Sequence, residues 1–231
     1  MKKTFVVGTG RCGTVTVTEL LNRSPHIKAG HEVPPVLIRE ATQYANGELP
    51  HNVAVDLLRR SYDEFDVVVN HKLSTMIPAI KEAYPDAKFI WLVRRAPGFV
   101  ASAIARKWYV SLRGTWEKNR LDWRADDSRV TWRLWELMTQ VDKCAWHWAH
   151  INKIIHVTLP LGNKRHIRIP IENLSGCVGE LFDFVGAPLP ENTEPGVLNR
   201  TVSGKEVNLT EEDHRVIDYW TADLMKRYYG E

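Results

Sequence analysis

Short apolar runs alternate with amphipathic segments along most of the chain. Residues 5–7, 66–70 and 88–94 are predicted to be buried strands. A segment whose apolar positions have helical spacing follows the strand over 5–7, and another follows the strand over 88–94. Strands that are continuous apolar runs and alternate with helices are typical of a parallel sheet covered on both faces. We therefore predict an α/β fold of three layers, with a parallel sheet flanked by helices.

The second half of the chain continues this pattern less regularly. We predict the following elements: a helix over 96–107, one or two long helices from 129 to about 155, a strand over 166–174, a helix over 175–185 and a last helix opened by Thr210. Residues 110–128 have mixed charge and no clear period, so we expect a lid or an irregular insertion there. The length of 231 residues suits one core, and we predict a single domain over 1–231.

Composition narrows the functional classes. A net charge of +3 is too small to indicate nucleic-acid binding, and we expect it to serve a local anionic site. The odd set of three cysteines has no C-x-x-C spacing and fits a reducing compartment. No apolar run has membrane-spanning length, and the N-terminus lacks the apolar region of a signal peptide. We expect a cytoplasmic protein with no nucleic-acid or membrane partner.

A glycine-rich turn, "GTGRCGT", follows the first strand. Gly8, Gly10 and Gly13 satisfy the dinucleotide pattern G-x-G-x-x-G, and the outer two also satisfy the glycines of a P-loop. A nucleoside-triphosphate P-loop continues with Lys and then Ser or Thr, but here Thr14 and Val15 stand in those places. The missing lysine and magnesium-binding hydroxyl argue against a kinase or an ATPase.

The dinucleotide interpretation is also weak. It requires a carboxylate at the end of a second strand, and Glu32 has about the right spacing. However, prolines follow Glu32, and we see no apolar strand immediately before it. The amides at the helix start would still bind an anion, and Arg11 adds a cation inside the turn.

A second segment predicts another anion site. The strand over 88–94 ends in Arg94, and Ser102 follows eight residues later, just inside the next helix. A guanidinium and a hydroxyl placed in this way can hold one compact dianion. Two anion sites without evident metal ligands suit a nucleotide that carries separate 5′ and 3′ groups.

Three segments together resemble the sulfotransferase family, which uses 3′-phosphoadenosine 5′-phosphosulfate (PAPS). "GTGRCGT" is similar to the loop for the 5′-phosphosulfate, "LVRRAPGFVASAIARKWY" to the 3′-phosphate segment, and "RIPIENLSGCVGELFDFVGAP" to a late strand and helix. They span most of residues 4–188. Three departures stand out: Cys12 replaces the usual Ser, Val15 replaces a frequent Thr, and Pro97 lies one place later than usual.

The resemblance implies a P-loop-like fold, PAPS as donor, 3′-phosphoadenosine 5′-phosphate (PAP) as product, and no metal. It implies that the donor is bound by Gly10, Arg11, Cys12, Gly13, Thr14, Val15, Arg94 and Ser102. Arg11 would also serve catalysis at the 5′ end, and Lys72, after the strand over 66–70, would stabilise the sulfuryl group or the leaving oxygen.

Three residues are candidates for the base that takes the acceptor's proton. We favour Glu32, because related sulfotransferases have an acidic residue after the first helix and a carboxylate near two cations stays ionised. His31 and His71 are rivals, since a histidine base is common among relatives that act on small phenols and alcohols. Glu32 also fits the plainer role of a carboxylate at a helix start.

The aromatic residues divide into two groups. Trp132, Trp135, Trp146 and Trp148 have near-helical spacing, for which core packing is the default, and His147 among them is expected to be a packed core residue. The candidates for contact with the acceptor are Trp108, Trp116 and Trp123. The acceptor hydroxyl itself stays open between a glycan, a small alcohol and a tyrosine.

Two alternative functions remain at this point. A small-molecule or nucleotide kinase with a degenerate P-loop would share the fold. A non-catalytic nucleotide-binding module would keep Arg11 and Arg94 but position no base.

Overall fold

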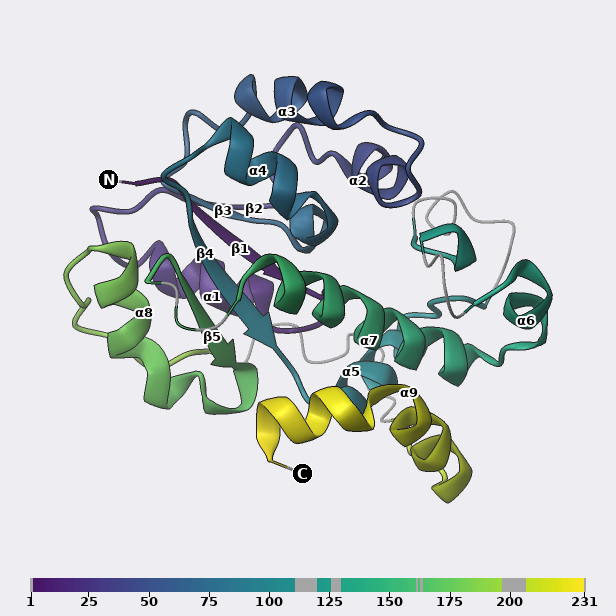
Figure 1. Ribbon diagram of the computed structural model, residues 1–231. Helices are drawn as coiled ribbons and strands as arrows, with labels where there is room; N and C mark the ends of the chain where they lie inside the picture. The colour runs from purple at the N-terminus through teal and green to yellow at the C-terminus, as the bar shows by residue number, and fades with distance from the viewer. Residues whose placement is uncertain are drawn as a thin grey trace.

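The protein has a five-stranded parallel sheet at its centre (Figure 1). The computed structural model describes residues 2–110, 120–125, 130–160, 162, 164–196 and 207–230. The strands are β1 (Thr4–Gly8), β2 (Ala29–His31), β3 (Val67–Val69), β4 (Lys88–Val93) and β5 (His166–Pro170), in the order β2-β3-β1-β4-β5. All neighbouring strands are parallel, which confirms the predicted α/β class.

Helices cover both faces of the sheet. They are α1 (Thr14–Leu21), α2 (Ile38–Ala45), α3 (His51–Arg59), α4 (Ile77–Ala83), α5 (Ala96–Ala105), α6 (Trp132–Leu137), α7 (Gln140–Thr158), α8 (Val178–Val185) and α9 (Glu211–Tyr229). Val6 of β1 packs with α1 and α8 on one face, whereas Phe5 and Val7 pack with the helices of the other face, α7 among them (Figure 1). Successive strand residues point to opposite faces, so the apolar run of β1 serves both cores.

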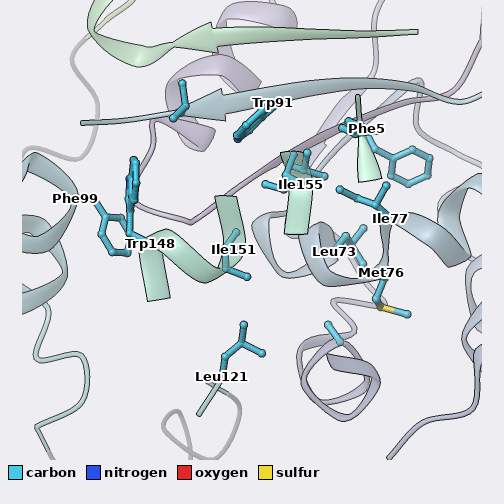
Figure 2. Close-up of a cluster of buried hydrophobic side chains, with 14 of the residues drawn as sticks. Phe5, Leu73, Met76, Ile77, Trp91, Phe99, Leu121, Trp148, Ile151 and Ile155 are labelled. Carbon is cyan, nitrogen blue, oxygen red and sulfur yellow. The ribbon is translucent and has the colours of Figure 1, made fainter. Parts of the chain in front are cut away.

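The larger core lies between the sheet and α7. Phe5, Trp91, Trp148 and Ile155 are among its buried residues (Figure 2), and Trp91 Nε1 donates to Asn152 Oδ1 at 3.1 Å. Three of the four tryptophans predicted to be core are buried. Trp132 is not: it is 56% exposed on α6, because that helix has only six residues and buries its other tryptophan.

Element boundaries differ from the predictions where tertiary pairing decides. β2 directly precedes Glu32, although the sequence shows no apolar strand there. The strand has only three residues and is not apolar throughout; it forms because its backbone pairs with β3. α8 begins at Val178 after a 3₁₀ turn rather than at residue 175, whereas Thr210 caps α9 with a reciprocal capping box, as expected.

None of the helices in the ranges described above is both long and apolar enough to cross a membrane.

Gly8, at the end of β1, lies close to the backbone of the neighbouring strand β4. A Cβ on Gly8 would lie 2.6 Å from the carbonyl oxygen of Leu92 in β4, a backbone atom that cannot rotate away. Gly179, in α8, has open space at the same point. We expect Gly8→Ala to destabilise the protein by about 1–3 kcal/mol and Gly179→Ala to stabilise it by up to about 1 kcal/mol. Urea unfolding of both variants measures this, and the same sign for both would contradict it.

Candidate active site

The loop between β1 and α1 has the backbone shape of an anion cradle. Gly10, Arg11 and Gly13 have φ angles of 75°, 54° and 80°, in the left-handed region. A cradle of this kind directs backbone N–H groups at the helix start towards one point. Ile171, just after β5, packs closely against Gly13. A Cβ added to Gly13 would lie only 2.2 Å from Ile171 Cδ1. The late "RIPIEN" segment therefore packs directly against the loop.

Hydrogen bonds with Ser74 anchor the start of this loop at Gly8. Ser74 Oγ accepts from Gly8 N–H at 2.9 Å and donates to Gly8 O at 2.8 Å. Cys12 is fully buried among apolar side chains, and this burial raises the pKa of its thiol to about 11. The thiol is therefore neutral and faces the core, so only the backbone of Cys12 is placed to contact a ligand. Thr14 and Val15 form the first turn of α1.

Arginines from two segments gather beside this loop. Arg11 Nε donates to Ser102 Oγ at 3.1 Å, and Arg94 Nη1 donates to the carbonyl oxygen of Arg11 at 2.9 Å. Burial, and then repulsion from Arg106 and Arg94, lowers the pKa of Arg11. The two predicted anion positions thus belong to one cationic cluster. Sequence reasoning missed Arg106, which follows Ser102 by four residues and caps the C-terminus of α5.

Arg94 and Arg95, which follow β4, make contacts with different parts of the molecule. The carbonyl of Arg94 accepts from Trp148 Nε1 at 2.8 Å, and its guanidinium lies so close to Gly98 that a Cβ there would be 3.2 Å from Arg94 Nε. Arg95 instead lies over the ring of Tyr229, 4.7 Å from its centroid. Only Arg94 therefore joins the cluster.

Glu32 and His71 form a hydrogen-bonded pair at the ends of β2 and β3. Glu32 Oε1 lies 3.1 Å from His71 Nδ1. The hydrogen bond from His71 lowers the pKa of Glu32, whereas burial lowers the pKa of His71 to about 4. At neutral pH the carboxylate is ionised and the imidazole is neutral. Its other edge lies over the loop: a Cβ on Gly10 would be 3.0 Å from His71 Nε2.

The remaining predicted residues lie beside this pair. His31 Nε2 is 3.0 Å from Thr14 Oγ1, so this histidine contacts the start of α1. Lys72 lies in a 3₁₀ helix over His71–Met76, and its backbone N–H donates to Asn70 Oδ1 at 2.9 Å. Burial, and then the charge of Arg120, lowers the pKa of Lys72 to about 8. The structure therefore brings Glu32, His71 and Lys72 together.

An aromatic wall borders Lys72 on the side of α7. His147 is buried, and its Nδ1 lies 2.9 Å from Tyr109 Oη, which also donates to the carbonyl of Leu121 at 2.9 Å. His147 is thus the packed core residue that the sequence predicts. Of the three candidate acceptor contacts, Trp108 is buried beneath Arg120, Trp123 is 37% exposed, and Trp116 lies outside the described residues.

Within the described ranges, no three His, Cys, Asp or Glu side chains lie close enough together to hold a metal ion.

Comparison with known proteins identifies the family. The sulfotransferase domain family matches residues 3–168. The structure is similar to the sulfotransferase STF9 from Mycobacterium avium, with 14% identity, a TM-score of 0.52, and coverage of 99% of this chain and 77% of that one. A sulfotransferase from Alicyclobacillus acidocaldarius matches with 14% identity, a TM-score of 0.52, and coverage of 100% and 95%.

These structural similarities confirm the fold, and a search of curated proteins found no match. The family match covers well over half of the chain and includes the loop, the Glu32–His71 pair and the arginine cluster. The family match also excludes the two alternatives, a kinase with a degenerate P-loop and a non-catalytic nucleotide-binding module. The chain belongs to the sulfotransferase domain family and is a PAPS-dependent transferase.

Proposed function

We propose that this protein transfers a sulfuryl group from PAPS to an acceptor hydroxyl, with His71 as the base. The observation that carries the proposal is the convergence of an anion cradle, an arginine cluster and a Glu32–His71 pair at the carboxyl edge of the sheet. Ligands of parallel α/β proteins bind at this edge. The acceptor class stays open between a glycan, a small alcohol and a tyrosine.

The residues present suit the two ends of the donor. The left-handed backbone of the loop suits it to hold a 5′-phosphosulfate with the amides of Gly10 to Thr14. Arg94, Ser102 and the newly found Arg106 offer two cations and a hydroxyl to a 3′-phosphate, and Arg11 lies between the two positions. When bound, PAPS supplies the sulfuryl group attached to a 5′-phosphate that can leave.

His71 is the base that the geometry favours. Glu32 is ionised, so Nδ1–H of His71 donates to it and Nε2 keeps a free lone pair facing the loop. As the acceptor oxygen bonds to sulfur, its proton passes to Nε2. Glu32 then acts as a positioning residue: it fixes the tautomer and stabilises the imidazolium as it forms. His31, whose Nε2 is engaged by Thr14, has no comparable arrangement.

Lys72 completes the charge balance. The bond between sulfur and the bridging oxygen breaks, and that oxygen keeps the electron pair. A cation placed where this charge develops lowers the barrier, most effectively at a site that excludes water. Lys72 is half-buried beside His71 and Glu32, which suits it to this role.

Arg94→Ala tests donor binding against the matched control Arg95→Ala. We expect Arg94→Ala to weaken PAP binding by about 10–100-fold, the value of a charged hydrogen bond. AMP, which lacks the 3′-phosphate, should lose much less affinity, and only through the contact of Arg94 with the loop carbonyl. Arg95→Ala should bind both ligands like the natural protein. Calorimetry gives the four ratios, and equal losses for PAP and AMP in Arg94→Ala would contradict the assignment.

The overall proposal is tested by turnover. Purified protein with labelled PAPS and a panel of hydroxyl acceptors should yield a sulfated product and PAP, and chelator should leave both PAP binding and turnover unchanged. Product formation that requires magnesium, or a preference for ATP over PAP in binding, would refute the proposal.

A further inference from the structure

A cavity of about 300 Å³ lies at the amino edge of the sheet, where the strands begin. The first residues of β4 and β5 and the C-terminal ends of α4 and α7 line it. The candidate active site lies at the opposite edge. Because β4 runs over six residues, Lys88–Val93, about 20 Å of strand separates the cavity from Arg94. Sulfuryl transfer at the active site therefore makes no use of this cavity.

The interior of the cavity is apolar except for one histidine. Ala87, Phe89 and Leu159 line it and are at most 4% exposed. His166, which pairs with Phe89 in the sheet, lines it as well and is only 9% exposed. Within the part of the chain that the structure describes, the ring of His166 forms no hydrogen bond. This buried ring therefore offers one donor and one acceptor to a molecule inside the cavity.

Two cations stand at the exposed rim of the cavity. Lys81 Nζ donates to the carbonyl of Thr158, at the end of α7. Arg165 Nη1 donates to the carbonyl of Pro85, and its other terminal nitrogen lies 3.9 Å from Asp86, which offsets part of its charge. An ammonium has three N–H donors, so the contact with Thr158 leaves two on Lys81. None of the described residues that line the cavity is acidic, and the rim keeps a net positive charge.

We propose that this cavity binds a small monocarboxylate, with its apolar part against Phe89 and Leu159 and its carboxylate between Lys81 and His166. Small-molecule sites are typically apolar pockets with a few convergent polar groups, and this volume is at the lower end of their range. The ligand is therefore limited to about one ring or one short chain. A single negative charge suits the rim, because Asp86 already balances part of Arg165. The inference concerns a second site and does not rest on the proposed function.

The experiment titrates phenylacetate and hexanoate, each beside its own primary amide, into the protein. PAP is present at saturation, so that the arginine cluster of the active site is not free to bind the acids. We expect each acid to bind about 5–20-fold more tightly than its amide, the combined value of an exposed charge pair and a hydrogen bond. NMR signals of the histidine rings report the place of binding. The signal of His166, assigned by its loss in His166→Phe, should shift, whereas that of His71 should stay.

Lys81→Met removes the charge of the rim and keeps the apolar stem. It should weaken binding of both acids by about fivefold and leave the amides unchanged. Lys226→Met, at an exposed position of α9, is the matched control and should bind the acids like the natural protein. Affinity for PAP should stay within about twofold in both variants, which shows that they are folded.

Four results would overturn the inference. They are equal binding of acid and amide, acid binding that is unchanged in Lys81→Met, a shift of the His71 signal in place of that of His166, and no shift of His166 at millimolar acid. Inorganic phosphate is a further probe, because it carries charge without an apolar part. It should bind much more weakly than either acid, and equal affinity would show that the apolar lining contributes nothing, against the proposal.

Discussion

Replacing His71 with asparagine should lower kcat by about 10²–10⁴-fold, the usual contribution of a positioned general base. Asparagine cannot take the acceptor's proton, but it keeps a polar group near Glu32. Affinity for PAP should change little, because the hydrogen bond of His71 joins it to Glu32. Single-turnover kinetics with saturating PAPS isolates the chemical step, and calorimetry with PAP reports on binding.

The Glu32 variants decide which member of the pair takes the proton. If Glu32 acts through His71, Glu32→Gln should cost less than His71→Asn, and the double variant should be no worse than His71→Asn alone, because groups that act as a unit are not additive. Turnover within about tenfold of natural in His71→Asn would instead make Glu32 the base, as sequence reasoning favoured. Normal turnover in both single variants would point to His31.

Replacing Lys72 with methionine should lower kcat by about 10²–10³-fold, because a cation at the leaving oxygen contributes about as much as one oxyanion-hole donor. Methionine has a similar length and keeps the packing of the stem. Lys153→Met, at an exposed position of α7, is the control and should leave turnover unchanged. A loss in Lys72→Met that appears only as a higher KM would show a binding role rather than a catalytic one.

Lys72 also predicts a dependence on pH. Only its charged form can stabilise the leaving oxygen, and with a pKa of about 8 that form is depleted as the pH rises above 8. The value of kcat/KM, which reports on the free enzyme, should therefore fall on the alkaline side of pH 8. In Lys72→Arg the guanidinium stays charged, so the alkaline fall should move beyond the accessible range. A fall near pH 8 that is unchanged in Lys72→Arg would assign it to another group.

Sequence pattern was sufficient for the fold class and for the glycine-rich loop between β1 and α1. The apolar runs of β1, β3 and β4 are continuous because both faces of these strands are buried, and burial of that kind is visible in one dimension. The turn around Gly10 and Gly13 was also predictable from the sequence, since a left-handed backbone favours glycine at these positions. Short elements such as β2, whose residues gain stability only from pairing with β3, were not.

Which side chains meet was decided by the tertiary structure alone. Glu32 and His71 are far apart along the chain and become a pair because the carboxyl ends of β2 and β3 lie side by side. The same packing turned Arg94 towards the site and Arg95 away from it, and placed Arg120 on Trp108. The sequence by itself thus determined the kind of fold and the glycine-rich loop, because local backbone geometry and burial leave a periodic pattern, whereas the expected donor was implied by the resemblance to the family. The arrangement that supports the proposed chemistry depends on distances between segments, and no local pattern encodes those.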